Sequence, residues 1–139
     1  MINEAMKSFP LAVLLLCPLP AAAQLAVTVT PPKVVGQKAV VQLKMKNDLG
    51  VAVKSARAVC FLLDEQGKML GQSTKWVIGQ NHTSLEPRAE TAFNFVVTNP
   101  QPFSTRNLTA KVSFVRVLLA GGQLADPTKD VIVEQPKEN

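Results

Sequence analysis

Ala58-Val59-Cys60-Phe61-Leu62-Leu63-Asp64-Glu65-Gln66-Gly67-Lys68 carries the clearest strand and turn signals of this sequence. Six apolar residues run into a polar turn signal, and a second run rich in Thr, Trp, Val and Ile follows up to Ile78. Apolar and β-branched runs separated by Asp and Gly are typical of two strands joined by a tight turn. We therefore predict a β-hairpin whose strands span residues 53–63 and 68–78.

Short β segments separated by turn residues also make up the sequence on either side of this hairpin. Residues 39–46 alternate, with Val41, Leu43 and Met45 on one face and polar side chains on the other. Seven such segments without helical periodicity predict an all-β fold, an antiparallel two-sheet sandwich of the immunoglobulin or fibronectin type III kind. A small barrel is the alternative. The remaining strands are expected over residues 25–30, 91–97, 108–119 and 131–133.

The N-terminal 23 residues have the pattern of a secretory signal peptide. A positive charge at Lys7 precedes the apolar run 11–17, and residues 21–23 provide the three alanines of a cleavage site. Two prolines interrupt the apolar run before it reaches the roughly 20 residues that a membrane span needs. We expect cleavage before Gln24, with an N-terminal anchor or a lipoprotein as the alternatives.

The expected organisation of the chain has three parts. We expect a signal peptide over residues 1–23, whether translation starts at Met1 or at Met6, a β-sandwich domain over residues 24–134 and a short polar tail over residues 135–139. The expected location is secreted or periplasmic, in a bacterial envelope, with no transmembrane segment after signal cleavage.

The composition favours one globular domain with an apolar core. Of 139 residues, 47% are apolar and 18% are charged. Cleavage removes one basic and one acidic residue, so the net charge of +5 belongs to the domain itself. It also removes Cys17 and leaves Cys60 as the only thiol, which excludes an intramolecular disulfide. Because Cys60 lies in an apolar run, we expect it to be buried and inert.

Three stretches in the middle of the chain, residues 40–47, 59–68 and 85–95, resemble the bacterial FxLYD-type domains. The namesake stretch of that family falls on residues 60–64, which read Cys-Phe-Leu-Leu-Asp and keep the Leu and the Asp. The resemblance implies a small extracytoplasmic β-sandwich, associated with the envelope and without known catalysis.

Residues suited to catalysis are scarce. The only His is His82, which lies in a polar loop without a Gly-rich oxyanion motif. Glu86 and Glu90 are a conceivable carboxylate pair, but solvated turn charges explain them adequately. We expect no catalytic residues and no enzyme.

Metal, cofactor and nucleic-acid sites also lack their patterns. After cleavage, Cys60 and His82 are too few to complete a zinc site, and no phosphate, dinucleotide or calcium motif is present. A copper carrier could use Met45, Met69 and His82, although Met45 continues a core-facing stripe. Basic residues are scattered and aromatic residues are few, so we expect no nucleic-acid partner and only a weak attraction to anionic surfaces.

One face of the predicted sheets indicates a partner. If Cys60 and its alternate neighbours face the core, the opposite face of the 53–63 strand is apolar where polar residues normally alternate. The 108–119 strand repeats this pattern, and the two strands are neighbours in an immunoglobulin-like sandwich. We expect dimerisation or docking of another envelope protein here, unless a reversed phase, a bulge or the C-terminal segment covers the surface. The candidate partner surface comprises Val59, Phe61, Leu63 and Val115.

Trp76 indicates a second class of binding. Its indole could stack on a sugar ring, although a lone Trp is more often a core residue or a partner anchor. We predict a noncatalytic module for protein–protein interaction or envelope structure. A small carbohydrate- or cell-wall-binding module using Trp76 is the alternative, and a periplasmic metal carrier is a distant one.

Overall fold

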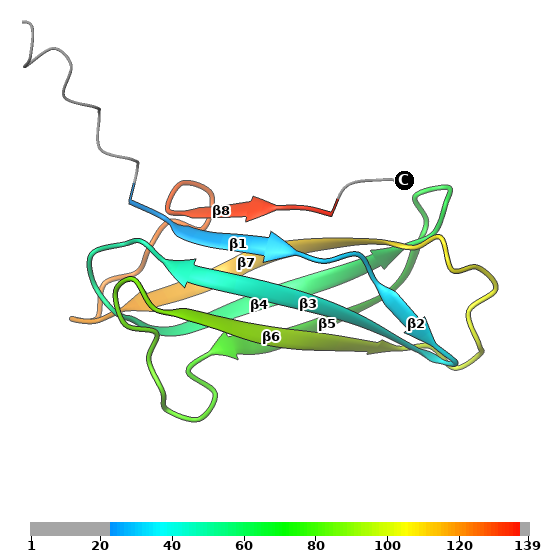
Figure 1. The fold of residues 1–139 in the computed structure, drawn as a ribbon, viewed down its shortest axis with the longest axis horizontal. Helices are drawn as coiled ribbons and strands as arrows, with labels where there is room; N and C mark the ends of the chain where they lie inside the picture. The colour runs from blue at the N-terminus through cyan, green and yellow to red at the C-terminus, as the bar shows by residue number, and fades with distance from the viewer. Residues whose placement is uncertain (1–22, 137–139) are drawn as a thin grey trace, which may run out of the picture.

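The computed structural model describes residues 23–136, which form a sandwich of two β-sheets (Figure 1). The predicted all-β two-sheet architecture is confirmed, and the predicted signal peptide lies outside the described residues except for Ala23. One sheet contains β1, β2, β3, β6 and β8, and the other contains β4, β5 and β7. The strand bounds are β1 (Leu25–Val29), β2 (Lys33–Val35), β3 (Lys38–Asn47), β4 (Val53–Leu63), β5 (Met69–Ile78), β6 (Glu90–Thr98), β7 (Thr109–Leu119) and β8 (Val131–Glu134).

The number of strands and one strand direction differ from the prediction. The additional strand, β2, pairs with the start of β3 across a turn at Gly36, whose φ of 62° suits glycine. Three residues are too few to show an alternating pattern, so the sequence did not reveal this strand. The last strand, β8, runs parallel to β1, with Leu25 opposite Val131. The sandwich is therefore antiparallel except where the first and last strands meet (Figure 1).

The β4–β5 hairpin is present within one residue of its predicted bounds. The Asp64 carboxylate accepts hydrogen bonds from the backbone N–H groups of Gln66 and Lys68, each at 2.9 Å. Gly67 takes a positive φ of 81° that closes the turn. This turn could be predicted from the sequence for two reasons. The Asp side chain provides hydrogen-bond acceptors for backbone N–H groups, and the Gly adopts the left-handed conformation without strain.

The core lies between the two sheets and is almost entirely apolar. Ala58, Cys60 and Leu62 of β4 are fully buried, as the predicted phase of this strand required. They pack against inward residues of the opposite sheet, the largest of which are Phe95, Leu25, Leu43 and Met45. Burial of these side chains is the main source of stability, because residues 23–136 contain only one Cys.

Different contacts join the two sheets along their two edges. On one side Gly71 of β5 packs against Val97 of β6, where an added Cβ would lie 2.9 Å from a Val97 methyl carbon. On the other side the Gln135 carboxamide bonds both the N–H and the carbonyl of Val112, at 3.2 and 3.1 Å. Gln135 thus imitates a neighbouring strand and covers this part of the β7 edge.

A search of residues 23–136 for a helix long and apolar enough to cross a membrane finds none.

Candidate functional site

The outer face of the three-stranded sheet carries the predicted partner surface. Because Cys60 and its alternate neighbours point into the core, Arg57, Val59, Phe61 and Leu63 of β4 point outward. The flanking strands β5 and β7 contribute the residues paired with them. We call this surface the outer face.

The apolar column of β4 is narrow, because polar residues flank it on both sides. Phe61 lies between Gln72 of β5 and Lys111 of β7, and Val59 has Thr74 and Ser113 in the equivalent positions. Val59 is only 8% exposed, whereas Phe61 and Leu63 are half-buried. Within the column, Phe61 and Leu63 therefore offer a partner more surface than Val59 does.

Val115 is more accessible than the β4 column and lies at a bulge of β7. Between the pairs Arg57–Arg116 and Ala58–Phe114 the register shifts by one residue, and Val115 is the extra residue of β7. Both Val115 and Arg116 are consequently exposed, Val115 by 53%. Bulges commonly redirect side chains in this way, although no regular alternation in the sequence announces them.

Two arginines occupy neighbouring positions at this end of the outer face. Arg57 and Arg116 are direct cross-strand partners, and the Arg57 guanidinium lies 5.7 Å from the ring centroid of Trp76. That distance is typical of a cation–π contact. Trp76 is 39% exposed, so the arginine covers part of an otherwise accessible indole.

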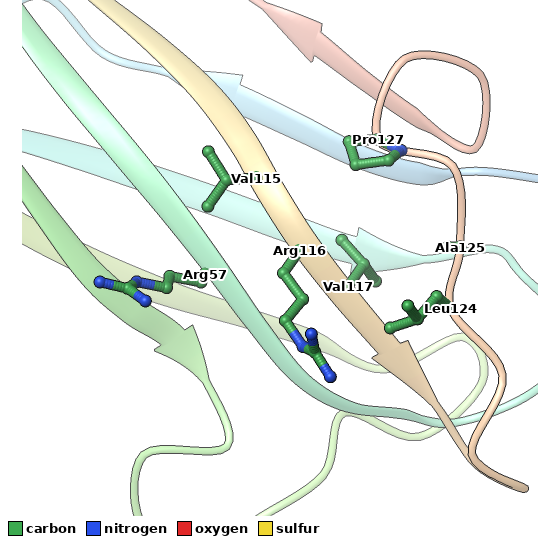
Figure 2. Close-up of a pocket in the computed structure, with 7 residues that line it drawn as sticks. All are labelled: Arg57, Val115, Arg116, Val117, Leu124, Ala125 and Pro127. Carbon is green, nitrogen blue, oxygen red and sulfur yellow. The ribbon is translucent and has the colours of Figure 1, made fainter.

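A pocket of about 360 Å³ lies beside the arginine pair (Figure 2). Its walls combine outer-face residues with the loop between β7 and β8, and the two guanidinium groups point apart. We call it the arginine pocket. The lining residues are Arg57, Val115, Arg116, Val117, Leu124, Ala125 and Pro127.

Backbone and side-chain hydrogen bonds hold the loop wall of the arginine pocket. The Ala125 N–H donates to the Val117 carbonyl at 2.9 Å, which ties the loop to β7. Asp126 accepts hydrogen bonds from the Thr128 hydroxyl and backbone N–H, and these bonds lower the pKa of the Asp126 carboxyl. The wall is thus shaped by the chain itself before any ligand arrives.

A second hollow of about 470 Å³ is lined by the end of β5, the start of β6 and the loop that joins them. Trp76 and the half-buried Phe93 line it together with Glu86 and Glu90, which the sequence had placed near each other. Further amide and hydroxyl groups come from the 79–84 loop. We call it the β5–β6 groove.

Asn47 fixes the loop that forms one wall of the β5–β6 groove. The structure places Asn47 at the end of β3 and buries it completely. Its side-chain amide donates to the carbonyls of Val51 and Leu85, and its side-chain oxygen accepts from the Leu49 N–H, all at 2.9 Å. Its backbone N–H donates a hydrogen bond to the Ala89 carbonyl, and its backbone carbonyl accepts one from the Arg88 N–H. Sequence reasoning missed this role, because Asn suits both an exposed turn and a buried anchor.

Nucleophilic and metal-ligating side chains are dispersed. His82 is exposed in a loop with a φ of 61°, while Met45 lies in the core and Met69 on the outer face. Burial raises the pKa of the Cys60 thiol to about 11. Among residues 23–136, no group of three or more His, Cys, Asp or Glu side chains is placed to hold a metal ion.

No family model matches the chain, and a search of curated proteins finds no significant match. Among solved structures, one described as an ApaA protein of Bordetella pertussis superposes with a TM-score of 0.54 at 12% identity, covering 76% of this chain and 89% of that one. IrmA of Escherichia coli gives 0.47 at 12% identity over 79% and 90% of the two chains. The CARDB domain of a Pyrococcus furiosus protein gives 0.43 at 16% identity over 82% and 88%. At these identities the likeness concerns the fold alone: this chain is an immunoglobulin-like β-sandwich.

Proposed function

We propose that this chain is a noncatalytic, FxLYD-like β-sandwich module, exported to the bacterial envelope, which binds a protein partner or a second copy of itself through the outer face. The observation that carries the proposal is the share of the accessible apolar side chains that lies on this one face. Among residues 23–136, half of the eight large apolar side chains that are exposed lie on or beside this face: Met69, Trp76, Val115 and Leu124.

The half-buried Phe61 and Leu63 lie between Met69 at one end of the outer face and Trp76 and Val115 at the other. Accessible apolar side chains that share one face with polar neighbours are typical of interaction sites. The absence of catalysis is supported by chemistry as well. The His82 imidazole is exposed in its loop, and the Cys60 thiol is buried with a raised pKa.

Two matched valine variants test the proposal. Val115→Ser changes the outer face, whereas Val96→Ser makes the same change at a 45% exposed valine of the other sheet. We expect a partner captured from envelope extract and identified by mass spectrometry to bind the wild type and Val96→Ser, but to be lost with Val115→Ser. Sedimentation velocity of the same variants tests a second copy as the partner.

Phe61→Ser provides an independent test at the centre of the outer face. Circular dichroism and urea unfolding first establish that this variant is folded, because Phe61 is half-buried. A partner that binds Val115→Ser and folded Phe61→Ser as well as it binds the wild type would contradict the proposal.

The β5–β6 groove favours a second candidate function, binding of a carbohydrate. Two aromatic side chains, two carboxylates and several amides line this groove. Such groups are typical of sugar-binding sites, because aromatic rings stack on the sugar and polar groups form hydrogen bonds with its hydroxyls. We expect glycan or peptidoglycan fragments to change Trp76 fluorescence if this candidate is correct. Phe93→Ala then abolishes that change, whereas Phe103→Ala, at a half-buried Phe that does not line the groove, leaves it intact.

A further inference from the structure

We propose that the arginine pocket recognises an acidic side chain of a protein partner together with an adjacent apolar side chain. The inference rests on the proposed function and specifies the chemistry of the partner. It follows from the charges, the apolar walls and the strand edge at this site.

The two cations stand on paired positions of β4 and β7, and no acidic side chain of the pocket lining compensates them. Arg57 and Arg116 are directly opposite on neighbouring strands, an arrangement that destabilises a sheet when the charges are alike. No Asp or Glu lines the pocket. A carboxylate placed there would relieve the repulsion and form charge-assisted hydrogen bonds with a guanidinium.

The pocket also has apolar walls, which an anion alone would leave uncovered. Val115 and Leu124 are exposed on either side of Arg116 in the lining, and Pro127 adds a third apolar wall. Inorganic phosphate would leave these apolar groups in water. An acidic residue next to a Leu, Val or Phe satisfies both kinds of wall at once.

The edge of β7 limits how the partner approaches. Gln135 covers this edge at Val112, and the segment 123–125 covers it at Val117 and Leu119. Between Gln135 and the segment 123–125, only residues 113–116 of this edge remain without such a covering group. A partner seated in the arginine pocket therefore has no long stretch of the β7 edge on which to add a strand, and we expect it to be recognised through its side chains.

Panning a random heptapeptide phage library on the purified protein tests the inference. We expect enrichment of peptides in which Asp or Glu adjoins an apolar residue. Synthetic versions of these peptides should bind Arg116→Gln at least about tenfold more weakly, because a charge-assisted hydrogen bond contributes roughly 1.5–3 kcal/mol.

Three matched measurements complete the test. Lys44→Gln removes one positive charge from an exposed position on the other sheet and should bind like the wild type. Replacing the acidic residue of the peptide by its amide should weaken binding to the wild type but not to Arg116→Gln. Arg57→Gln should also weaken binding, and Trp76 fluorescence reports the loss of its cation–π contact separately.

The outcomes separate this inference from the proposed function. Binding that is lost with Phe61→Ser but unchanged by Arg116→Gln would overturn the acidic specificity and leave the outer face as a docking surface. Enriched peptides without acidic residues, or no enrichment, would overturn it as well. Binding insensitive to Phe61→Ser, Val115→Ser and Arg116→Gln would overturn both.

Discussion

Asn47 is the residue on which the loops at one end of the sandwich most depend. Three side-chain hydrogen bonds and two backbone bonds join it to segments 49–51 and 85–89. A buried amide in this position is stable only because every polar atom has a partner. The same bonds position the wall of the β5–β6 groove, so Asn47 is a positioning residue for the second candidate site.

Asn47→Ala should lower the free energy of unfolding by about 1–3 kcal/mol, because it leaves buried carbonyl and N–H groups without partners. Urea unfolding followed by Trp76 fluorescence measures the change. Asn94→Ala, at an exposed position of β6, is the control and should change stability little. Equal effects of the two substitutions would contradict the anchoring role.

The Cys60 thiol makes stability depend on pH in the alkaline range. Its pKa is raised from 9.0 to about 11 by burial, so between these values the unfolded chain loses the proton while the folded chain retains it. The free energy of unfolding should therefore fall as pH rises from 9 to 11, by roughly 1–3 kcal/mol. The chain has no Tyr to titrate in this interval.

The difference between wild type and Cys60→Ala isolates this contribution, since lysines titrate equally in both proteins. We expect the difference in unfolding free energy to shrink as pH rises from 9 to 11. A constant difference over this interval would show that burial does not shift the thiol pKa.

At the scale of elements, the contact between β5 and β6 depends on a missing side chain. Gly71 lets the two edge strands approach where any Cβ would contact Val97 at 2.9 Å. Gly71→Ala should destabilise the fold by about 1–3 kcal/mol through overpacking. In a Val97→Ala background, which frees the space, the same substitution should cost much less. A double-mutant cycle measures this coupling, and additive effects would contradict it.

The Gln135 carboxamide protects the edge of β7. Gln135→Ala exposes the N–H and carbonyl of Val112, which are then available to another chain. We expect increased self-association of this variant by sedimentation velocity, relative to the wild type and to Gln66→Ala at an exposed turn. An unchanged monomer fraction would show that other groups cover this edge.

At the scale of the whole molecule, the positive charge is spread rather than focused. The net charge is +5, and basic residues occupy both outer surfaces, for example Lys44 on β3 and Lys111 on β7. We expect the protein to sediment with anionic lipid vesicles at about 10 mM salt and to be released at about 150 mM. At the higher salt concentration the Debye length is about 8 Å, so the attraction between the scattered charges and the lipid surface is largely screened. Retention at the higher salt concentration would indicate a specific lipid site and contradict the diffuse attraction.

The general architecture was predictable from local patterns. The hairpin turn carries Asp64 and Gly67, the strands alternate, and both signals act over a few residues. The outward direction of Val115 followed from the same alternation. The bulge that leaves Arg116 exposed as well, the short β2 and the parallel β1–β8 pair could not be predicted, because none of them produces a local period in the sequence.

Local patterns alone indicate that this chain is a β-sandwich, identify several of its core residues, and show that no disulfide links residues 23–136. The pairing of Arg57 with Arg116 beside Leu124, the burial of Asn47 and the contact of Gln135 with Val112 arise only in the folded chain. The two kinds of feature differ in how far apart along the chain the interacting residues lie. Alternation and turn chemistry act between residues adjacent in sequence, whereas pockets, anchors and covered edges arise between segments that pairing and burial bring together.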